Sequence, residues 1–399
     1  MKFTYAGLSG RFLLLCLGLL LCSLPGFAYE KLSDDTLKAI PRPGHDFNIH
    51  NGAILAPILR TRVAGTPGHD AVLEHLVTFV RTMLPKWELE FQNCTSQTPA
   101  SAGKQVPFVN VIAYRDPPGT SVGDVGRLTF VAHYDSKLTP TGFIGAIDSA
   151  APLAMIMHAM RNIDDALDKK WAAMKAQGID TSLEEQRGIQ LLFLDGEESF
   201  HRWTDTDSLY GARSLAAQWD KEKYQAMSTF KTRLSSISLF VLLDLLGSKG
   251  PTIQSFYETT HWAYQGISSL EQRLRSLGNW KSSSASWFID ASRDSHHIKP
   301  SSPVADDHLP FLARGVEIMH LIDFAAFKGF PSVWHTMDDD GEHLDMDTVE
   351  DWSVLISAFA AEWMELEGYL DHGHPTDVKA RQEEEPKWEA NRLDRQTEL

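Results

Sequence analysis

Two adjacent carboxylates follow an apolar run in the middle of the chain. The run Leu191–Leu194 leads directly into Asp195-Gly196-Glu197-Glu198. Neighbouring carboxylates at the end of a buried strand repel each other unless a cation or a shared proton compensates. A divalent ion can bind one of them while the other stays free to transfer protons. On this pattern alone, either Glu197 or Glu198 could take either role.

Other polar side chains lie at the ends of other apolar runs. His133 and Asp135 follow the run Leu128–Ala132, and Asp244 lies inside Leu242–Leu246, where an unpaired charge would be costly. Three further candidates precede helical patterns or lie in loops: Asp148, Asp306 and His335. Each residue taken singly could be structural, as an N-cap, a core residue or a surface residue.

Together, these residues have the composition of a zinc site without cysteine. Nitrogen and oxygen donors that converge from several apolar runs suit a zinc ion. A site made of Asp148, Glu198 and His335 would leave the fourth tetrahedral position for water or substrate, which is the arrangement of catalytic zinc. We therefore expect a catalytic metal site.

Alternating strand and helix patterns must position these residues. Strand patterns lie near 87–92, 108–114, 127–132, 189–194, 237–246 and 316–322, and helical patterns near 72–84, 149–162, 207–219, 261–277 and 346–368. The charged stretch 164–187 shows no clear pattern. The alternation predicts an α/β fold, a single-domain three-layer sandwich with a mostly parallel central sheet flanked by helices on both faces. Sites in such folds lie on loops at the carboxyl ends of strands.

The composition is that of a globular, acidic protein. The 399 residues are 43% hydrophobic and 23% charged, and 37 Lys and Arg against 53 Asp and Glu give a formal charge of -16. This charge argues against nucleic acid as a partner and favours cations, such as metal ions and peptides with a free ammonium group.

The amino terminus predicts entry into the secretory pathway. Lys2 and Arg11 precede an apolar run, 12–24, that is too short to span a bilayer comfortably. We expect residues 1–28 to be a signal peptide, 29–369 the catalytic domain and 370–399 an acidic solvated tail. The protein would be secreted or lie in the secretory lumen without a membrane span. The alternative is a retained signal that anchors it in the endoplasmic reticulum or Golgi membrane.

The secretory route gives meaning to one further motif. Cys94 is the only cysteine beyond the signal, so the mature chain cannot form an intramolecular disulfide. The tripeptide Asn93-Cys94-Thr95 is a glycosylation sequon, which predicts a glycoprotein.

Seven motifs together are typical of one enzyme family. They are His133-Tyr134-Asp135-Ser136-Lys137, Asp148-Ser149-Ala150, Asp195-Gly196-Glu197-Glu198, Asp207-Ser208-Leu209-Tyr210-Gly211, Leu242-Leu243-Asp244-Leu245, Asp306-Asp307-His308 and Val333-Trp334-His335-Thr336-Met337-Asp338-Asp339. With them, the chain resembles the glutaminyl-peptide cyclotransferases, or glutaminyl cyclases, from about residue 40 to 368. These acyltransferases convert the amino-terminal glutamine of a peptide or protein to pyroglutamate and release ammonia.

The resemblance assigns roles to individual residues. It implies one zinc ion per chain, held by Asp148, Glu198 and His335. It makes Glu197 the proton-transfer residue, supported by Asp244 and Asp306. The substrate pocket would be bordered by Trp203, Phe330 and Trp334. The partners would be peptides or proteins with amino-terminal glutamine, and we expect the enzyme to be a monomer.

Two other functions fit part of the pattern. A co-catalytic zinc aminopeptidase has a two-metal ligand set that matches, by type and order, His133, Asp148, Glu198, Asp244 and His335. The motifs around Trp203, Asp306 and Trp334 favour the cyclase instead. A catalytically inactive binding ectodomain would be expected to have lost a ligand or the proton shuttle, and every one of these residues is present.

Overall fold

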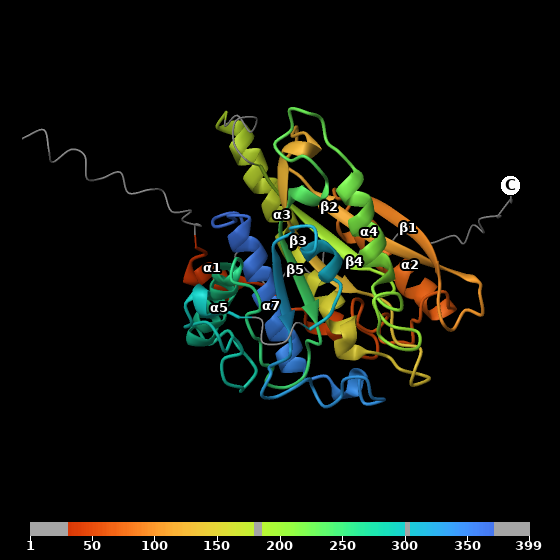
Figure 1. Cartoon of the computed structure of the whole chain (residues 1–399). Helices are drawn as coiled ribbons and strands as arrows, with labels where there is room; N and C mark the ends of the chain where they lie inside the picture. The colour runs from red at the N-terminus through yellow and green to blue at the C-terminus, as the bar shows by residue number, and fades with distance from the viewer. Residues whose placement is uncertain (1–30, 179–185, 300–303, 371–399) are drawn as a thin grey trace, which may run out of the picture.

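A six-stranded sheet forms the centre of the computed structural model, which describes residues 31–178, 186–299 and 304–370 (Figure 1). The strand order is β1-β2-β4-β3-β5-β6. The strands are β1 (Glu88–Gln97), β2 (Gln105–Arg115), β3 (Val125–His133), β4 (Gln186–Leu194), β5 (Ile237–Asp244) and β6 (Ile318–Ile322). The strands from β4 to β6 are parallel, and β1 and β2 add an antiparallel edge. The predicted signal segment and, except for residue 370, the predicted tail lie outside the described residues.

Helices cover both faces of this sheet, which confirms the predicted three-layer α/β fold. They are α1 (Asp34–Ala39), α2 (Pro67–Met83), α3 (Ala151–Ala176), α4 (Tyr210–Lys221), α5 (His261–Ser276), α6 (Leu309–Leu312) and α7 (Met346–Trp363). The larger hydrophobic cluster joins one face of the sheet to α2, α3, α5 and α7, and a smaller cluster joins the other face to α4 and α6. Among the described helices, none is both long enough and apolar enough to cross a bilayer.

Strand β4 shows why its sequence is an unbroken apolar run. Leu191 and Phe193 belong to the larger cluster, whereas Leu192 and Leu194 belong to the smaller one. Successive side chains of a strand point to opposite faces, and both faces are buried under helices here. Because both faces are buried, the inner strands consist mainly of apolar residues, and most of the polar site residues lie at or beyond the strand ends.

Helix α3 extends beyond the predicted 149–162 into the charged stretch, as far as Ala176. Ala166, Leu167 and Trp171 are buried there. The carboxylate of Asp164 forms an ion pair with Arg115, so a charge on the inner face is compensated. Because Arg115 of β2 pairs with this buried charge, the helix can continue through a stretch whose sequence pattern is polar.

The parallel strands bring the expected polar residues to one edge of the sheet. His133 at the end of β3 is in register with Leu194 at the end of β4. Asp244 ends β5, opposite Ile322 at the end of β6. Because parallel strands end at the same edge, the loops that follow them surround a common site.

Candidate active site

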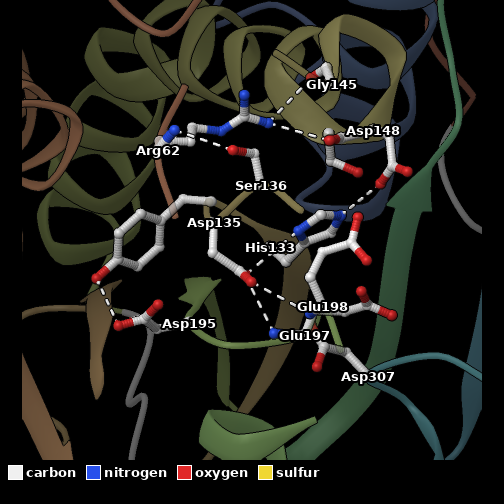
Figure 2. Close-up of polar contacts among 12 residues, drawn as sticks. Arg62, His133, Asp135, Ser136, Gly145, Asp148, Asp195, Glu197, Glu198 and Asp307 are labelled. Carbon is white, nitrogen blue, oxygen red and sulfur yellow. Dashed lines mark hydrogen bonds and ion pairs between the residues drawn. The ribbon is translucent and has the colours of Figure 1, made fainter. Parts of the chain in front are cut away.

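Three residues from separate loops converge at this edge. Asp148 lies just before α3, Glu198 follows β4, and His335 lies in the loop before α7; each offers a ligand atom, and these atoms lie within 4.8 Å of one another (Figure 2 labels Asp148 and Glu198). His335 Nε2 is 3.4 Å from Asp148 Oδ2 and 3.8 Å from Glu198 Oε1. The predicted set is therefore brought together.

The charges of this group fit a cation. Glu198 Oε1 is buried and has no hydrogen-bond partner. Burial raises the pKa of Glu198 well above its ordinary value, and the charge of Asp148 raises it further. Burial also acts to raise the pKa of Asp148, but hydrogen bonds from His133 and His335 outweigh it, so the pKa is lowered. Two carboxylates and an imidazole with an orphaned oxygen suit zinc.

Asp135 holds the two glutamates in place. Its Oδ1 accepts a hydrogen bond from the main-chain N–H of Glu197, and its Oδ2 accepts one from Glu198, both at 3.1 Å (Figure 2). Gly196 has a φ of +68°, and an added Cβ there would lie 2.5 Å from the ring of Phe108. The tight turn at Gly196 places the side chains of Glu197 and Glu198 in different positions. The two glutamates can therefore have different roles. Sequence reasoning noted Asp135 but did not predict that it binds the main chain of both glutamates.

Glu197 is a buried carboxyl with increased proton affinity. Burial raises its pKa well above the ordinary value, and the negative charges of Glu198 and Asp306 add to the increase against the opposing effect of His133. A carboxyl whose pKa is moved toward neutrality can both accept and return a proton near pH 7.

Asp244 lies beside Asp148, one of the three predicted zinc ligands. It accepts a hydrogen bond from the hydroxyl of Ser149, and its Oδ1 lies 3.7 Å from His133 Nε2. Burial, together with the charge of Asp306, raises the pKa of Asp244 to about 6.

Asp306 is held by a histidine from inside the sheet. Its Oδ2 lies 2.8 Å from Nε2 of His320, in the middle of β6. Burial acts to raise the pKa of Asp306, but the contacts with His320 prevail and lower it. Sequence reasoning missed His320, because an isolated polar residue in an apolar run carries no indication of its partner. It included Ser149 in a motif but gave it no role.

Two of the three predicted pocket aromatics, Phe330 and Trp334, lie beside the predicted ligand His335. The rings of Phe330 and Trp334 are 4.1 Å apart, and those of Trp334 and His335 are 3.9 Å apart. His335 itself has a φ of +58°, a conformation that few non-glycine residues adopt outside functional sites. Trp203 lies in the loop between β4 and α4 and is 36% exposed. That Phe330, Trp334 and Trp203 border the substrate pocket stays a prediction.

A buried arginine, which sequence reasoning missed, fixes the loop before Asp148. Arg62 is 0% exposed and donates hydrogen bonds to the carbonyls of Gly145 and Asp148 (Figure 2). It also donates to the carbonyl of Ile144. Gly145 has a φ of +65°, and a Cβ there would lie 2.2 Å from the carbonyl oxygen of Asp148. The loop can therefore be this tight only with glycine at that position.

Asp339 connects the same loop to the one that carries His335. Its Oδ1 accepts a hydrogen bond of 2.7 Å from the N–H of Ile147, and its carbonyl accepts one from Ala146. Burial and the charge of Asp148 raise the pKa of Asp339 to about 8. The two loops that carry the predicted ligands Asp148 and His335 are thus joined directly.

The fold and this group of possible metal-ligand atoms are those expected of an α/β protein of the zinc-peptidase class. In agreement, the family model described as Peptidase family M28 matches residues 110–360, more than half of the chain.

Individual relatives narrow the class further. Glutaminyl-peptide cyclotransferase of Bos taurus is 35% identical over 320 residues, which are 78% of this chain and 81% of that protein. The Drosophila melanogaster protein of the same name is 35% identical over 322 residues, 79% of this chain and 81% of its own. The crystal structure of Macrostomum lignano glutaminyl cyclase has a TM-score of 0.68 at 29% identity, covering 86% of this chain and 96% of that one. The chain belongs to the glutaminyl-peptide cyclotransferase family, which confirms the resemblance.

Proposed function

We propose that this protein converts the amino-terminal glutamine of peptides and proteins to pyroglutamate and releases ammonia. The observation that carries the proposal is the buried carboxyl of Glu197 beside the converging group Asp148, Glu198 and His335, in a chain 35% identical to named cyclotransferases. The formal charge of -16 suits substrates that carry a free ammonium group and opposes nucleic acid.

Asp148, Glu198 and His335 would hold one zinc ion per chain. The orphaned Oε1 of Glu198 and the nitrogen and oxygen donors support this assignment. When bound, zinc supplies a Lewis acid that polarises the side-chain carbonyl of the substrate glutamine.

Glu197 would move the proton that the reaction must transfer. The α-nitrogen attacks the carbonyl carbon of the glutamine side chain, a C–N bond closes the five-membered ring, and the bond to the side-chain nitrogen breaks. Free α-amines have pKa values of about 7.7–8.0, so much of the substrate arrives protonated. Glu197 would accept one proton from the α-ammonium group before the attack and return it to the side-chain nitrogen, which leaves as ammonia. The second proton that the α-nitrogen loses passes to solvent after the ring has closed, so that the neutral lactam remains.

Asp244 and Asp306 would support this step by their charge and hydrogen bonds. The charge of Asp306 raises the pKa of Glu197 in addition to burial, which makes the ionised carboxylate a stronger base. Ser149 and His320 fix the two aspartates through the contacts described above. Phe330, Trp334 and Trp203 would border the pocket for the glutamine side chain.

A two-metal aminopeptidase is the second candidate, and one observation favours it. His133, Asp148 and Asp244 form another group whose ligand atoms lie within 4.8 Å of one another, and Asp148 belongs to both groups. A peptide beginning with glutamine and one beginning with leucine separate the two functions. Loss of the mass of ammonia from the first supports the cyclase, whereas release of free leucine together with two metal ions per chain contradicts it.

Glu197→Gln tests the proton-transfer role. The variant should keep zinc, because the metal ligands are intact, and lose about 10²–10⁴-fold in cyclisation rate. The neighbouring Glu198→Gln is the matched control and should lose zinc as well as activity. Metal analysis and a mass-based rate assay measure both. Normal turnover by Glu197→Gln would remove this role.

We further propose that the chain is secreted as a monomeric glycoprotein after cleavage of residues 1–28. Asn93 is exposed on the edge strand β1, where a glycan would not disturb packing. Expression in a eukaryotic secretory host should yield protein in the medium whose mass falls on glycosidase treatment. Thr95→Ala, which removes the sequon, should show no such change. A cell-retained protein would instead indicate the anchored alternative.

A further inference from the structure

A second group of metal-ligand atoms lies next to the proposed catalytic residues and shares none of their zinc ligands. Asp306, His308 and His320 are all buried, and each offers a ligand atom within 4.8 Å of the others. Asp306 and His308 come from the turn before α6, and His320 comes from the middle of β6. The rings of His308 and His320 are 4.5 Å apart.

His308 is the residue that points to a ligand. It is 0% exposed, and neither of its ring nitrogens has a hydrogen-bond partner. A buried polar group without a partner is unfavourable, and such groups in folded proteins need an explanation. Burial and the neighbouring His320 lower the pKa of His308 to about 3, so the imidazole is neutral and has a lone pair available at neutral pH.

The neighbouring Asp307 adds a second unsatisfied group. Both of its carboxylate oxygens are buried without a hydrogen-bond partner. Burial raises its pKa well above the ordinary value, and the charge of Asp306 raises it further. The neutral imidazole of His308 beside crowded carboxylates is a combination that a divalent cation would satisfy.

The donor types select the class of ion. Two imidazoles and one carboxylate suit zinc and similar transition metals, whereas calcium and magnesium prefer oxygen ligands. A bound ion would replace a hydrogen that is shared between Nε2 of His320 and Oδ2 of Asp306, which now lie 2.8 Å apart. Binding would therefore release a proton and weaken as the pH falls.

We propose that Asp306, His308 and His320 form a second zinc site, weaker than the catalytic one, whose occupation inhibits the enzyme. The site is weaker because the ion must lose its water in a fully buried place and displace a proton, whereas the side chain of His335 in the catalytic group is 30% exposed. The binding claim stands without the proposed function, and the inhibition rests on it.

The contacts of Asp306 explain why the second ion would inhibit. Oδ2 of Asp306 lies 2.8 Å from Nε2 of His320, which holds this aspartate in place. A dication bound to Asp306, His308 and His320 would replace that contact and engage the carboxylate that would support Glu197. The predicted zinc ligands Asp148, Glu198 and His335 would remain untouched.

The test titrates the full chain, loaded with one equivalent of zinc, with further zinc chloride. Equilibrium dialysis with metal analysis should show a second bound ion in the unmodified protein, and cyclisation should fall at least tenfold as that ion binds. His308→Asn should bind one ion, keep its basal rate within about twofold, and resist excess zinc. His297→Asn, the same change at an exposed histidine, should behave like the unmodified protein.

Three results would overturn the proposal. One is a single bound ion in the unmodified protein at every zinc concentration. Another is a second ion and inhibition that persist in folded His308→Asn. The third is loss of the second ion in His133→Asn but not in His308→Asn, which would place it at the group containing Asp148 and Asp244.

Cobalt keeps the test independent of activity and of variant folding. Co²⁺ added to the unmodified protein should give an absorption spectrum for the second equivalent that differs from the first, because the ligand sets differ. A second equivalent that leaves the spectrum of free Co²⁺ unchanged would refute the site even if His308→Asn failed to fold. A protein that binds two ions but has no cyclase activity would refute the proposed function and leave the metal site intact.

Discussion

At the scale of single residues, the site contains many buried carboxylates, and a few positively charged groups compensate their charge. Arg62 is the clearest example, since its fully buried guanidinium binds the main chain of the loop that presents Asp148. Burial lowers the pKa of Arg62, and the charges of Asp148 and Asp135 act in the opposite direction. Its hydrogen bonds resemble the outer contacts that orient ligands in metal sites.

Arg62→Lys should reduce zinc affinity by about 10–100-fold. Lysine keeps the charge but cannot donate to several carbonyls in the fixed geometry of a guanidinium, so the Asp148 loop should loosen. Arg60→Lys, two residues away and exposed, is the control and should leave the affinity unchanged. Competition with a chelator measures the affinity, and thermal unfolding measures stability. Lower stability with unchanged zinc affinity would make the role of Arg62 structural only.

The residue scale also shows what sequence reasoning could reach. Glu197 and Glu198 were found because adjacent carboxylates after an apolar run are visible locally. Arg62 was not found, because the carbonyl of Asp148 that it binds is 86 residues away in the sequence. Every residue has a main-chain carbonyl, so residue types cannot identify such an acceptor. The roles of the two glutamates came from family resemblance, since residue type alone cannot separate them.

At the scale of elements, the periodic cores of helices and strands were predictable, whereas their ends were not. Helix α2 was expected over 72–84, but it begins at Pro67, where the missing N–H of proline suits the first turn. Helix α3 was extended by tertiary contacts, with Trp171 buried and Asp164 paired to Arg115. Such partners lie outside any local window of sequence.

Helix α3 also contains a buried histidine that makes stability depend on pH. His158 Nδ1 lies 3.2 Å from Nη2 of Arg161, and its Nε2 lies 3.0 Å from the carbonyl oxygen of Pro41. This arrangement fits the neutral ring, with Nδ1 accepting and Nε2–H donating. Burial, with the charge of Arg161, lowers the pKa of His158 to about 4.

The sign of the effect follows from this lowered pKa. The unfolded chain, with a histidine pKa near 6.5, binds more protons than the folded chain between about pH 6.5 and 4. The contribution of neutral His158 to the free energy of unfolding is therefore fully present above about pH 6.5. It is lost as the pH falls to about 4, and the total loss is about 3 kcal/mol. Urea unfolding of His158→Gln should show a smaller decrease over this range, and exposed His45→Gln should keep the original decrease. Parallel pH profiles for all three proteins would contradict this role.

At the scale of the whole molecule, the two ends of the described domain are joined. The N–H of Leu32 donates to Glu362 Oε2 at 3.1 Å, and the N–H of Ser33 donates to Glu367 Oε2 at 2.8 Å. Thr36 Oγ1 also bonds Glu367, at 3.1 Å. Segments 330 or more residues apart in the sequence thus close the fold beside α7. Composition could indicate where the domain ends, but it could not reveal that the ends bind each other.

This closure predicts which truncations the enzyme tolerates. A chain of residues 29–369 keeps both glutamates and should match the signal-free full chain in melting temperature, zinc content and cyclisation rate. A chain of residues 29–361 loses both glutamates and the buried Trp363 and Leu366, and it should unfold or bind zinc poorly.

The double variant Glu362→Gln and Glu367→Gln, made in the 29–369 chain, tests the hydrogen bonds of the two glutamates alone. It keeps the buried Trp363 and Leu366, which the shorter truncation removes. Charged hydrogen bonds contribute about 1.5–3 kcal/mol each when shielded, and these are partly exposed, so we expect a total loss of about 1–3 kcal/mol. None of the proposed catalytic or metal-binding residues takes part in these hydrogen bonds, so the folded variant should keep its rate. Thermal unfolding and the mass-based assay measure the two effects. If the 29–369 chain were itself unstable, the catalytic domain would have to extend into residues 370–399.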